Sequence, residues 1–104
     1  MLQLSQIIHL LMFHVYILIN KRRTVFYTGS ASDLKNRIYF HKKKLIAGFT
    51  KKYNVDQLVY YESLNDIESA RKREKQVKSY SREKKKALVE SMNPSWEDLT
   101  PKLA

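Results

Sequence analysis

The segment FHVYILINKRRTVFYTG, residues 13–29, contains the strongest pattern for secondary structure in this chain. Its first part, Phe13–Ile19, is rich in β-branched and aromatic residues that alternate between two faces, which predicts a strand. The polar residues 20–23 predict a turn, and Val25–Thr28 predicts a second short strand that ends at Gly29. Together these segments predict a β-hairpin at the start of the domain.

The segment after the hairpin predicts one helix and one more strand. Small polar residues at 30–33 can cap a helix that runs from about Asp33 to about Lys44. Residues 48–54 contain turn-forming glycine and asparagine and predict a loop. Residues Leu58–Glu62 predict the third strand.

Two more helices are predicted in the rest of the chain. Asn65 with Glu68 three residues later is a capping-box pattern, which opens a helix that ends at about Ser79. Ser81 can cap a last helix, which ends before Asn93 because a proline follows it. The order β-β-α-β-α-α predicts an α+β fold in which a small three-stranded antiparallel sheet is flanked by helices.

A chain of 104 residues has room for one domain, which we place at residues 13–99. Residues 1–12 form an N-terminal leader, and residues 100–104 form a tail. The leader lacks the basic start and cleavage site of a signal peptide and is too short to span a bilayer. It is either an extra helical turn or the product of a start codon upstream of a natural start at Met12.

Basic residues dominate the charge of the chain. Twenty Lys and Arg against ten Asp and Glu give a formal net charge of +10, which attracts polyanions. The charge is concentrated, since residues 71–86 hold nine basic and two acidic side chains and residues 42–52 hold five lysines. We therefore favour nucleic acid over a membrane as the partner, with DNA favoured over RNA. The lysines expected to contact phosphate are Lys42, Lys43, Lys51, Lys52, Lys72, Lys75, Lys84 and Lys85.

The composition also excludes several kinds of site. The chain contains no cysteine, which excludes disulfides, thiolate zinc sites and cysteine nucleophiles. This fits a reducing compartment, so a cytoplasmic localisation is expected. A hydrophobic fraction of 43% is sufficient for a packed core.

Polar residues stand where the first predicted helix should be apolar. Leu34, Ile38 and Leu45 form its core stripe. Arg37 and His41 lie at the edge of this stripe, one turn apart, rather than on the solvated face. A histidine in such a position is, by itself, more often a satisfied and half-buried side chain than a catalytic one.

The later helix repeats this anomaly. Ile67, Ala70 and Val77 define its buried stripe, and Glu74 lies among them. A carboxylate there is costly to bury unless it is paired, hydrogen-bonded or bound to a metal. Two interpretations stay open: a buried ion pair with Arg37 that holds the helices in register, or a functional site.

These motifs together resemble the GIY-YIG nuclease family. The tripeptides His14-Val15-Tyr16 and Tyr27-Thr28-Gly29 resemble its two tyrosine motifs, and Arg37 resembles its arginine. Residues 69–78 resemble the helix that carries the family's metal-binding glutamate. Residues 93–99 are similar to the tail of the small stand-alone bacterial members, which are related to the nuclease module at the start of the bacterial excision-repair endonuclease.

The resemblance covers residues 13–99, with two departures. The family's Gly-Ile-Tyr is replaced by His-Val-Tyr and its Tyr-Ile-Gly by Tyr-Thr-Gly, but both motifs keep the tyrosine. In some members an asparagine follows the glutamate helix, and Asn93 is the candidate for it here.

The resemblance implies a metal-dependent endonuclease that hydrolyses nucleic-acid phosphodiester bonds. Glu74 would bind one divalent cation, Mg²⁺ with Mn²⁺ as a substitute, and Arg37 would brace the scissile phosphate. Structure-selective cutting is expected, because a domain this small has little surface for reading a long sequence. The alternative is a non-catalytic nucleic-acid-binding protein that keeps the fold.

The resemblance also implies how the proton of the attacking water is handled. Tyr16 would act as the general base, Tyr27 would position the water, and His41 would tune or relay the proton. A free phenol has a pKa of about 10, so nearby cations must lower the pKa of Tyr16. Gly29 would let backbone and substrate approach closely.

Overall fold

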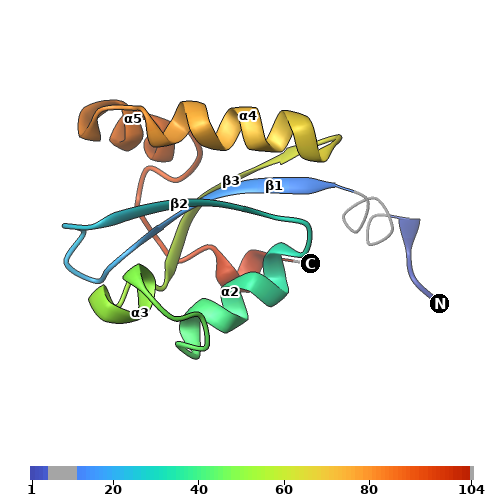
Figure 1. Cartoon of the computed structure of the whole chain (residues 1–104), viewed down its shortest axis with the longest axis horizontal. Helices are drawn as coiled ribbons and strands as arrows, with labels where there is room; N and C mark the ends of the chain where they lie inside the picture. The colour runs from blue at the N-terminus through green and yellow to red at the C-terminus, as the bar shows by residue number, and fades with distance from the viewer. Residues whose placement is uncertain (5–11, 104) are drawn as a thin grey trace.

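Strand β1 (Phe13–Ile19) forms the centre of the sheet. The computed structural model describes residues 1–4 and 12–103, and in it β1 lies between β2 (Phe26–Ala31) and β3 (Gln57–Leu64), antiparallel to both (Figure 1). Six of the seven β1 residues are buried, as expected for a strand with a neighbour on each side and helices on each face. Strands β2 and β3 are therefore the two edges of the sheet.

Helices cover both faces of this sheet. They are α2 (Leu34–Lys42), α3 (Phe49–Tyr53), α4 (Ile67–Lys78), α5 (Arg82–Met92) and a 3₁₀ helix at Thr100–Lys102. Helices α4 and α5 lie on one face, whereas α2 and α3 lie on the other (Figure 1). This arrangement confirms the predicted α+β fold and the predicted order of its main elements.

The alternation of side chains along β1 builds two separate cores. Val15 and Ile17 pack toward α4 and α5, where they meet Val77 among others. Tyr16 and Leu18 point to the opposite face and pack with residues of α2. Because Tyr16 and helix α4 lie on opposite faces, groups from both can meet only around an edge of the sheet.

The prediction that the core stripe of α2 extends to Leu45 is wrong. The helix stops at Lys42, and Lys44 adopts a left-handed conformation with φ of 56°. This change of direction carries Leu45 off the stripe, so that its side chain is 64% exposed rather than buried. The prediction that Ile67 is buried in α4 is also wrong, since Ile67 is the first residue of that helix and is 47% exposed.

The cap of α4 also differs from the prediction. Asp66, and not Asn65, is the N-cap residue, and its carboxylate accepts a 2.7 Å hydrogen bond from the backbone N–H of Ser69. The predicted pairing of Asn65 with Glu68 was therefore one residue out of register. Aspartate serves equally well because its oxygen satisfies one of the free N–H groups of the first helical turn.

Two further segments contain more structure than was predicted. The loop expected at residues 48–54 contains the short helix α3, which starts after Gly48 with its φ of 104°. In the C-terminal tail, Leu103 is buried in the same core as Tyr16. Most of the predicted leader, residues 5–11, lies outside the described residues. Among residues 1–4 and 12–103, no helix has the length and apolar character needed to cross a membrane.

Candidate active site

A buried chain of three side chains starts at Tyr16. Its hydroxyl lies 3.0 Å from Nε2 of His41, and Nδ1 of the same ring lies 3.0 Å from Oγ1 of Thr50. All three residues are buried, with exposed fractions of 0%, 3% and 5%. In the tautomer that carries its proton on Nδ1, His41 donates to Thr50 and accepts from the Tyr16 phenol. The sequence drew attention to His41 but not to Thr50, which reaches it from α3.

The ionisation of this pair is set by burial. Burial, and then the charge of Arg37, lower the pKa of His41 to about 4, so the imidazole is neutral at neutral pH. Burial also raises the pKa of Tyr16, as do Tyr27 and Glu74, while Arg37 lowers it. The expectation that nearby cations lower the pKa of Tyr16 is wrong for the protein by itself, because desolvation outweighs the single guanidinium.

Gly29 leaves the space in which the Tyr16 ring lies. The two residues are partners in the β1–β2 pair, and a Cβ at position 29 would stand 2.6 Å from the Tyr16 hydroxyl. The close approach expected at Gly29 is thus made by Tyr16. The half-buried Tyr27 completes the cluster, with its ring centroid 6.2 Å from that of Tyr16 and 5.5 Å from that of His41.

Glu74 reaches the same edge from the α4 face of the sheet. Ser30 donates a hydrogen bond to its Oε1, and the Lys78 ammonium lies 2.6 Å from its Oε2. Burial raises the pKa of Glu74, but the hydrogen bonds from Lys78 and Ser30 outweigh it and keep the pKa below its usual value. The side chain is 20% exposed and ionised at neutral pH. The alternative of a buried ion pair between Glu74 and Arg37 is wrong, since Glu74 pairs with Lys78 and Arg37 is exposed.

Arg37 lines an open hollow between α2 and α4. The hollow has a volume of about 230 Å³, and Ser30 and Arg71 line it too. Two guanidinium groups from different helices therefore flank the serine that holds Glu74. The charge of Arg37 affects the pKa values of both His41 and Tyr16, and Tyr27 and Glu74 also affect the pKa of Tyr16. The five predicted catalytic residues therefore interact electrostatically at this edge of the sheet.

Sequence reasoning missed Ser30 and Arg71 as members of this site. Ser30 directly follows the Tyr-Thr-Gly tripeptide, and its side chain alternates with Gly29 toward the α4 face. Arg71 precedes Glu74 by three residues, which is one helical turn. Strand alternation and helical spacing could therefore have found both.

Asn93 does not belong to the site. Its side chain is 2% exposed and donates to the carbonyl oxygens of Val59 at 3.1 Å and Glu97 at 2.8 Å. Its Oδ1 accepts from the backbone N–H of Glu97. Since Val59 lies in β3, on the edge opposite β2, Asn93 fastens the C-terminal segment to the far side of the sheet.

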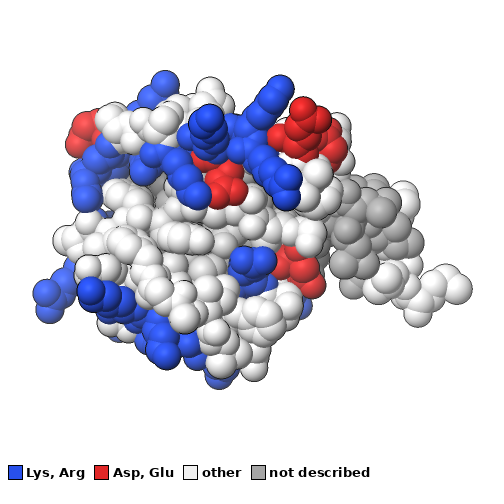
Figure 2. Space-filling model, in the orientation of Figure 1, with Lys and Arg blue, Asp and Glu red and all other residues white. Residues whose placement is uncertain are grey.

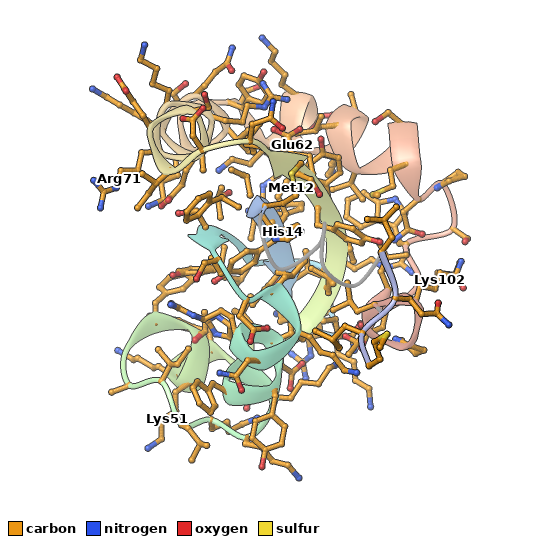
Figure 3. The ribbon with its side chains drawn as sticks, turned by 90° about the vertical axis from the view of Figure 1, so that its right-hand side faces the viewer. Met12, His14, Lys51, Glu62, Arg71 and Lys102 are labelled. Atoms are coloured by element: carbon orange, nitrogen blue, oxygen red, sulfur yellow. The ribbon has the colours of Figure 1, made fainter. Side chains whose placement is uncertain are left out.

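The two basic segments come together on one face. Figure 2 shows Lys and Arg in two rows, over α4 and α5 above and over α2 and α3 below, with an uncharged band between them along β2. In Figure 3, Arg71 and Lys51 point to the same side of the molecule, and Lys102 lies on the opposite side.

One of the lysines predicted to contact phosphate is bound within the protein: Lys42 lies 2.6 Å from Asp98 and donates a 3.0 Å hydrogen bond to the Asp56 carbonyl oxygen. The other predicted lysines are exposed, except for the partly buried Lys85.

Glu74 is the carboxylate at this edge of the sheet that could bind a metal ion. Within residues 1–4 and 12–103, no group of three or more His, Asp and Glu side chains could hold a metal ion. Glu74 is an ionised carboxylate that accepts a hydrogen bond from Ser30, a residue of the open hollow, and the Lys78 ammonium lies against its Oε2. Because the Lys78 side chain is 54% exposed, it can move away. The residues therefore fit a hard divalent ion that takes its other ligands from water and substrate.

Comparison with known sequences places this geometry in a family. The family model described as the GIY-YIG catalytic domain matches residues 12–87. The chain belongs to the GIY-YIG family. The match contains both tyrosine motifs, Arg37, His41 and Glu74, and it ends before the Asn-Pro-Ser-Trp segment of the tail.

Several similar proteins are named as UPF0213 proteins. The chain is 41% identical over 63 residues to a UPF0213 protein of Staphylococcus saprophyticus, which is 61% of this chain and 77% of that protein. It is 38% identical over 64 residues to one of Haloquadratum walsbyi, covering 62% and 72% of the two chains. The solution NMR structure of a UPF0213 protein from Bacillus halodurans covers 86% of this chain and 94% of its own, with a TM-score of 0.54 and 32% identity.

Proposed function

We propose that this GIY-YIG protein is a divalent-metal-dependent endonuclease that hydrolyses nucleic-acid phosphodiester bonds, with DNA favoured over RNA. One observation carries the proposal: a phenol hydrogen-bonded to a neutral imidazole lies at the same strand edge as an ionised carboxylate and an exposed guanidinium. These are the groups that phosphodiester hydrolysis needs, namely a proton acceptor, a cation ligand and a phosphate clamp.

Substrate binding is assigned to the basic face. The two rows of Lys and Arg contact the backbone on either side of the uncharged band along β2. Arg37 binds the scissile phosphate through its planar fork, and Arg71, on the other wall of the same hollow, binds a second oxygen or the next phosphate.

Glu74 is the residue proposed to hold the metal ion. Mg²⁺ is the expected cation, with Mn²⁺ as a substitute, and it would take the place now held by the Lys78 ammonium. When bound, it supplies positive charge to the phosphoryl and departing oxygens. Ser30 keeps the carboxylate in position through its hydrogen bond to Oε1.

Tyr16, Tyr27 and His41 are proposed to handle the proton of the attacking water. Tyr16 takes the proton from the water, and His41, which is neutral and accepts at Nε2, takes the phenol proton. The Glu74 charge is one cause of the raised pKa of Tyr16. A cation bound to Glu74 would offset this contribution and lower the pKa of Tyr16, so the phenol would pass its proton to His41 more readily when the metal is bound. Tyr27, beside both rings, orients the water.

The test is cleavage of labelled duplex, single-stranded, flap and junction DNA and of matching RNA, with Mg²⁺, with Mn²⁺ and with chelator. Metal-dependent cutting that disappears in Tyr16→Phe and Glu74→Gln supports the proposal. A wild type that binds these nucleic acids but cuts none with either metal overturns it and leaves the non-catalytic binding protein.

A further inference from the structure

A second hollow lies at the other end of the uncharged band, beside the β1–β2 turn. It has a volume of about 310 Å³ and is lined by Thr24, Val25, Phe26, Phe49, Arg82 and Lys85. Phe49 comes from α3, whereas Arg82 and Lys85 come from α5 on the opposite face of the sheet. The hollow therefore crosses the β2 edge, as the predicted active site does.

The Phe49 wall is aromatic and open to solvent. Its ring is 48% exposed and belongs to neither hydrophobic core of the described residues. It lies nearly parallel to the ring of Tyr27, with 6.4 Å between the centroids and 26° between the planes, and it packs against Tyr53 at 4.9 Å. An exposed aromatic ring held by two aromatic neighbours is a ready stacking surface for a nucleobase.

The opposite wall carries fixed positive charge. The Arg82 guanidinium lies 5.2 Å from the centre of the Phe26 ring and donates a 2.9 Å hydrogen bond to the Thr24 carbonyl oxygen. These contacts orient the group without neutralising it, because neither partner is an anion. Lys85 adds a second positive charge to the same wall, and none of the six lining residues is acidic.

Position links this hollow to the proposed reaction. Phe49 stacks on Tyr27, and Tyr27 contacts the His41 ring, so the aromatic surface continues from the predicted catalytic cluster into the hollow. Strand β2 joins the two hollows, since Ala31 lines the hollow that contains Arg37 and Phe26 lines this one, so a nucleic-acid strand that passes Arg37 and follows β2 reaches this hollow next. A base paired inside a duplex presents no free face, so only an unpaired nucleotide can use this stacking surface.

We propose that this hollow binds one unpaired nucleotide of the strand that carries the scissile phosphate. The base stacks on Phe49, and Arg82 and Lys85 bind its phosphate. The inference rests on the proposed function and deepens it: the substrate is nucleic acid with a single-stranded segment in the strand that is cut, such as a flap or a frayed end.

The test compares Phe49→Leu with Phe49→Trp. Binding of a flap substrate and of a blunt duplex is measured by fluorescence anisotropy in chelator. Phe49→Leu is expected to weaken flap binding about tenfold, the effect of losing one base–aromatic stack, and to change duplex binding by less than about twofold. Phe49→Trp keeps a stacking face and is expected to retain flap binding. Tyr39→Leu, which removes an exposed ring from α2 outside the hollow, is the control and is expected to change neither.

The outcomes separate the two proposals. If the wild type binds and cuts DNA but Phe49→Leu binds flap and duplex as the wild type does, or loses both equally, the nucleotide subsite is overturned and the endonuclease stands. If the wild type binds the flap with the expected Phe49 dependence but cuts nothing, the endonuclease is overturned and the binding subsite stands. Equal melting temperatures for Phe49→Leu and wild type are expected, because the ring lies outside the core.

Discussion

Gly29 and Tyr16 face one another across the β1–β2 pair, and a methyl group at position 29 would lie 2.6 Å from the Tyr16 hydroxyl. Tyr16 is fully buried, so its ring cannot swing aside without breaking the hydrogen bond to His41. Gly29→Ala is therefore expected to lower the free energy of unfolding by about 1–3 kcal/mol. Cleavage should be lost as well. Urea denaturation and the cleavage assay measure the two effects, and an alanine variant with wild-type activity would show that Tyr16 need not stay in place.

Thr28, next to Gly29, provides a matched substitution on the other face of the same strand. Its side chain is 4% exposed, and its hydroxyl has no hydrogen-bond partner among the described residues. Thr28→Val replaces this hydroxyl by a methyl group of similar size and should raise the free energy of unfolding by about 1 kcal/mol. Cleavage should not change. A clear loss of stability on urea denaturation would mean that the hydroxyl has a partner.

His41 predicts a dependence of stability on pH. Its pKa is about 4 in the folded protein, against about 6.5 for an unperturbed histidine, so protonation favours the unfolded chain. The free energy of unfolding is therefore highest above pH 6.5, and it falls by up to about 3 kcal/mol as the pH falls toward 4. His41→Gln cannot titrate, so subtracting its unfolding free energy from that of the wild type at each pH cancels the other groups. A flat difference between pH 7 and pH 4 would contradict the burial of a neutral imidazole.

Glu74→Gln separates a metal ligand from a structural residue. Glutamine can still accept from Ser30, and only the ion pair with the exposed Lys78 is lost, which is worth less than about 1 kcal/mol. Melting in chelator should therefore change little, and binding of nucleic acid without metal should remain within about twofold of wild type. Metal-dependent cleavage should fall below detection. A loss of 3 kcal/mol or more in chelator would assign Glu74 to the scaffold.

Lys72 and Lys75 test the role of the basic face. Both are exposed on α4, so the double alanine variant should melt with the wild type. The slope of log affinity against log salt for a duplex should become shallower by up to about 2, since two phosphate contacts are removed. Lys102→Ala is the control, because Lys102 lies on the opposite side of the molecule (Figure 3). If Lys102→Ala changed the slope as much, per lysine removed, as the double variant does, the overall charge and not this face would govern binding.

Local sequence determined the scaffold and several of the residues that the site uses. The alternation in residues 13–19 fixed a buried central strand, and the helical spacing in 67–78 placed Glu74 beside the buried Ala70 and Val77. These features depend on which side of a helix or strand is apolar, and the spacing of apolar residues in the sequence shows this. The same local reasoning failed at Leu45 and Asn65, where a single left-handed residue or a cap shifted by one position changed the outcome.

Which side chains lie in contact depends on the tertiary fold. The sequence pattern alone allowed an ion pair between Glu74 and Arg37. In the structure, α4 packs on β2, and Glu74 accepts a hydrogen bond from Ser30 and pairs with Lys78 instead. The fold likewise brought Thr50 to His41 and turned Lys42 toward Asp98. Periodicity tells which face of an element is buried, but it carries no information on the partner across that face. That choice is made by strand register and helix packing, which bring together residues far apart in the sequence.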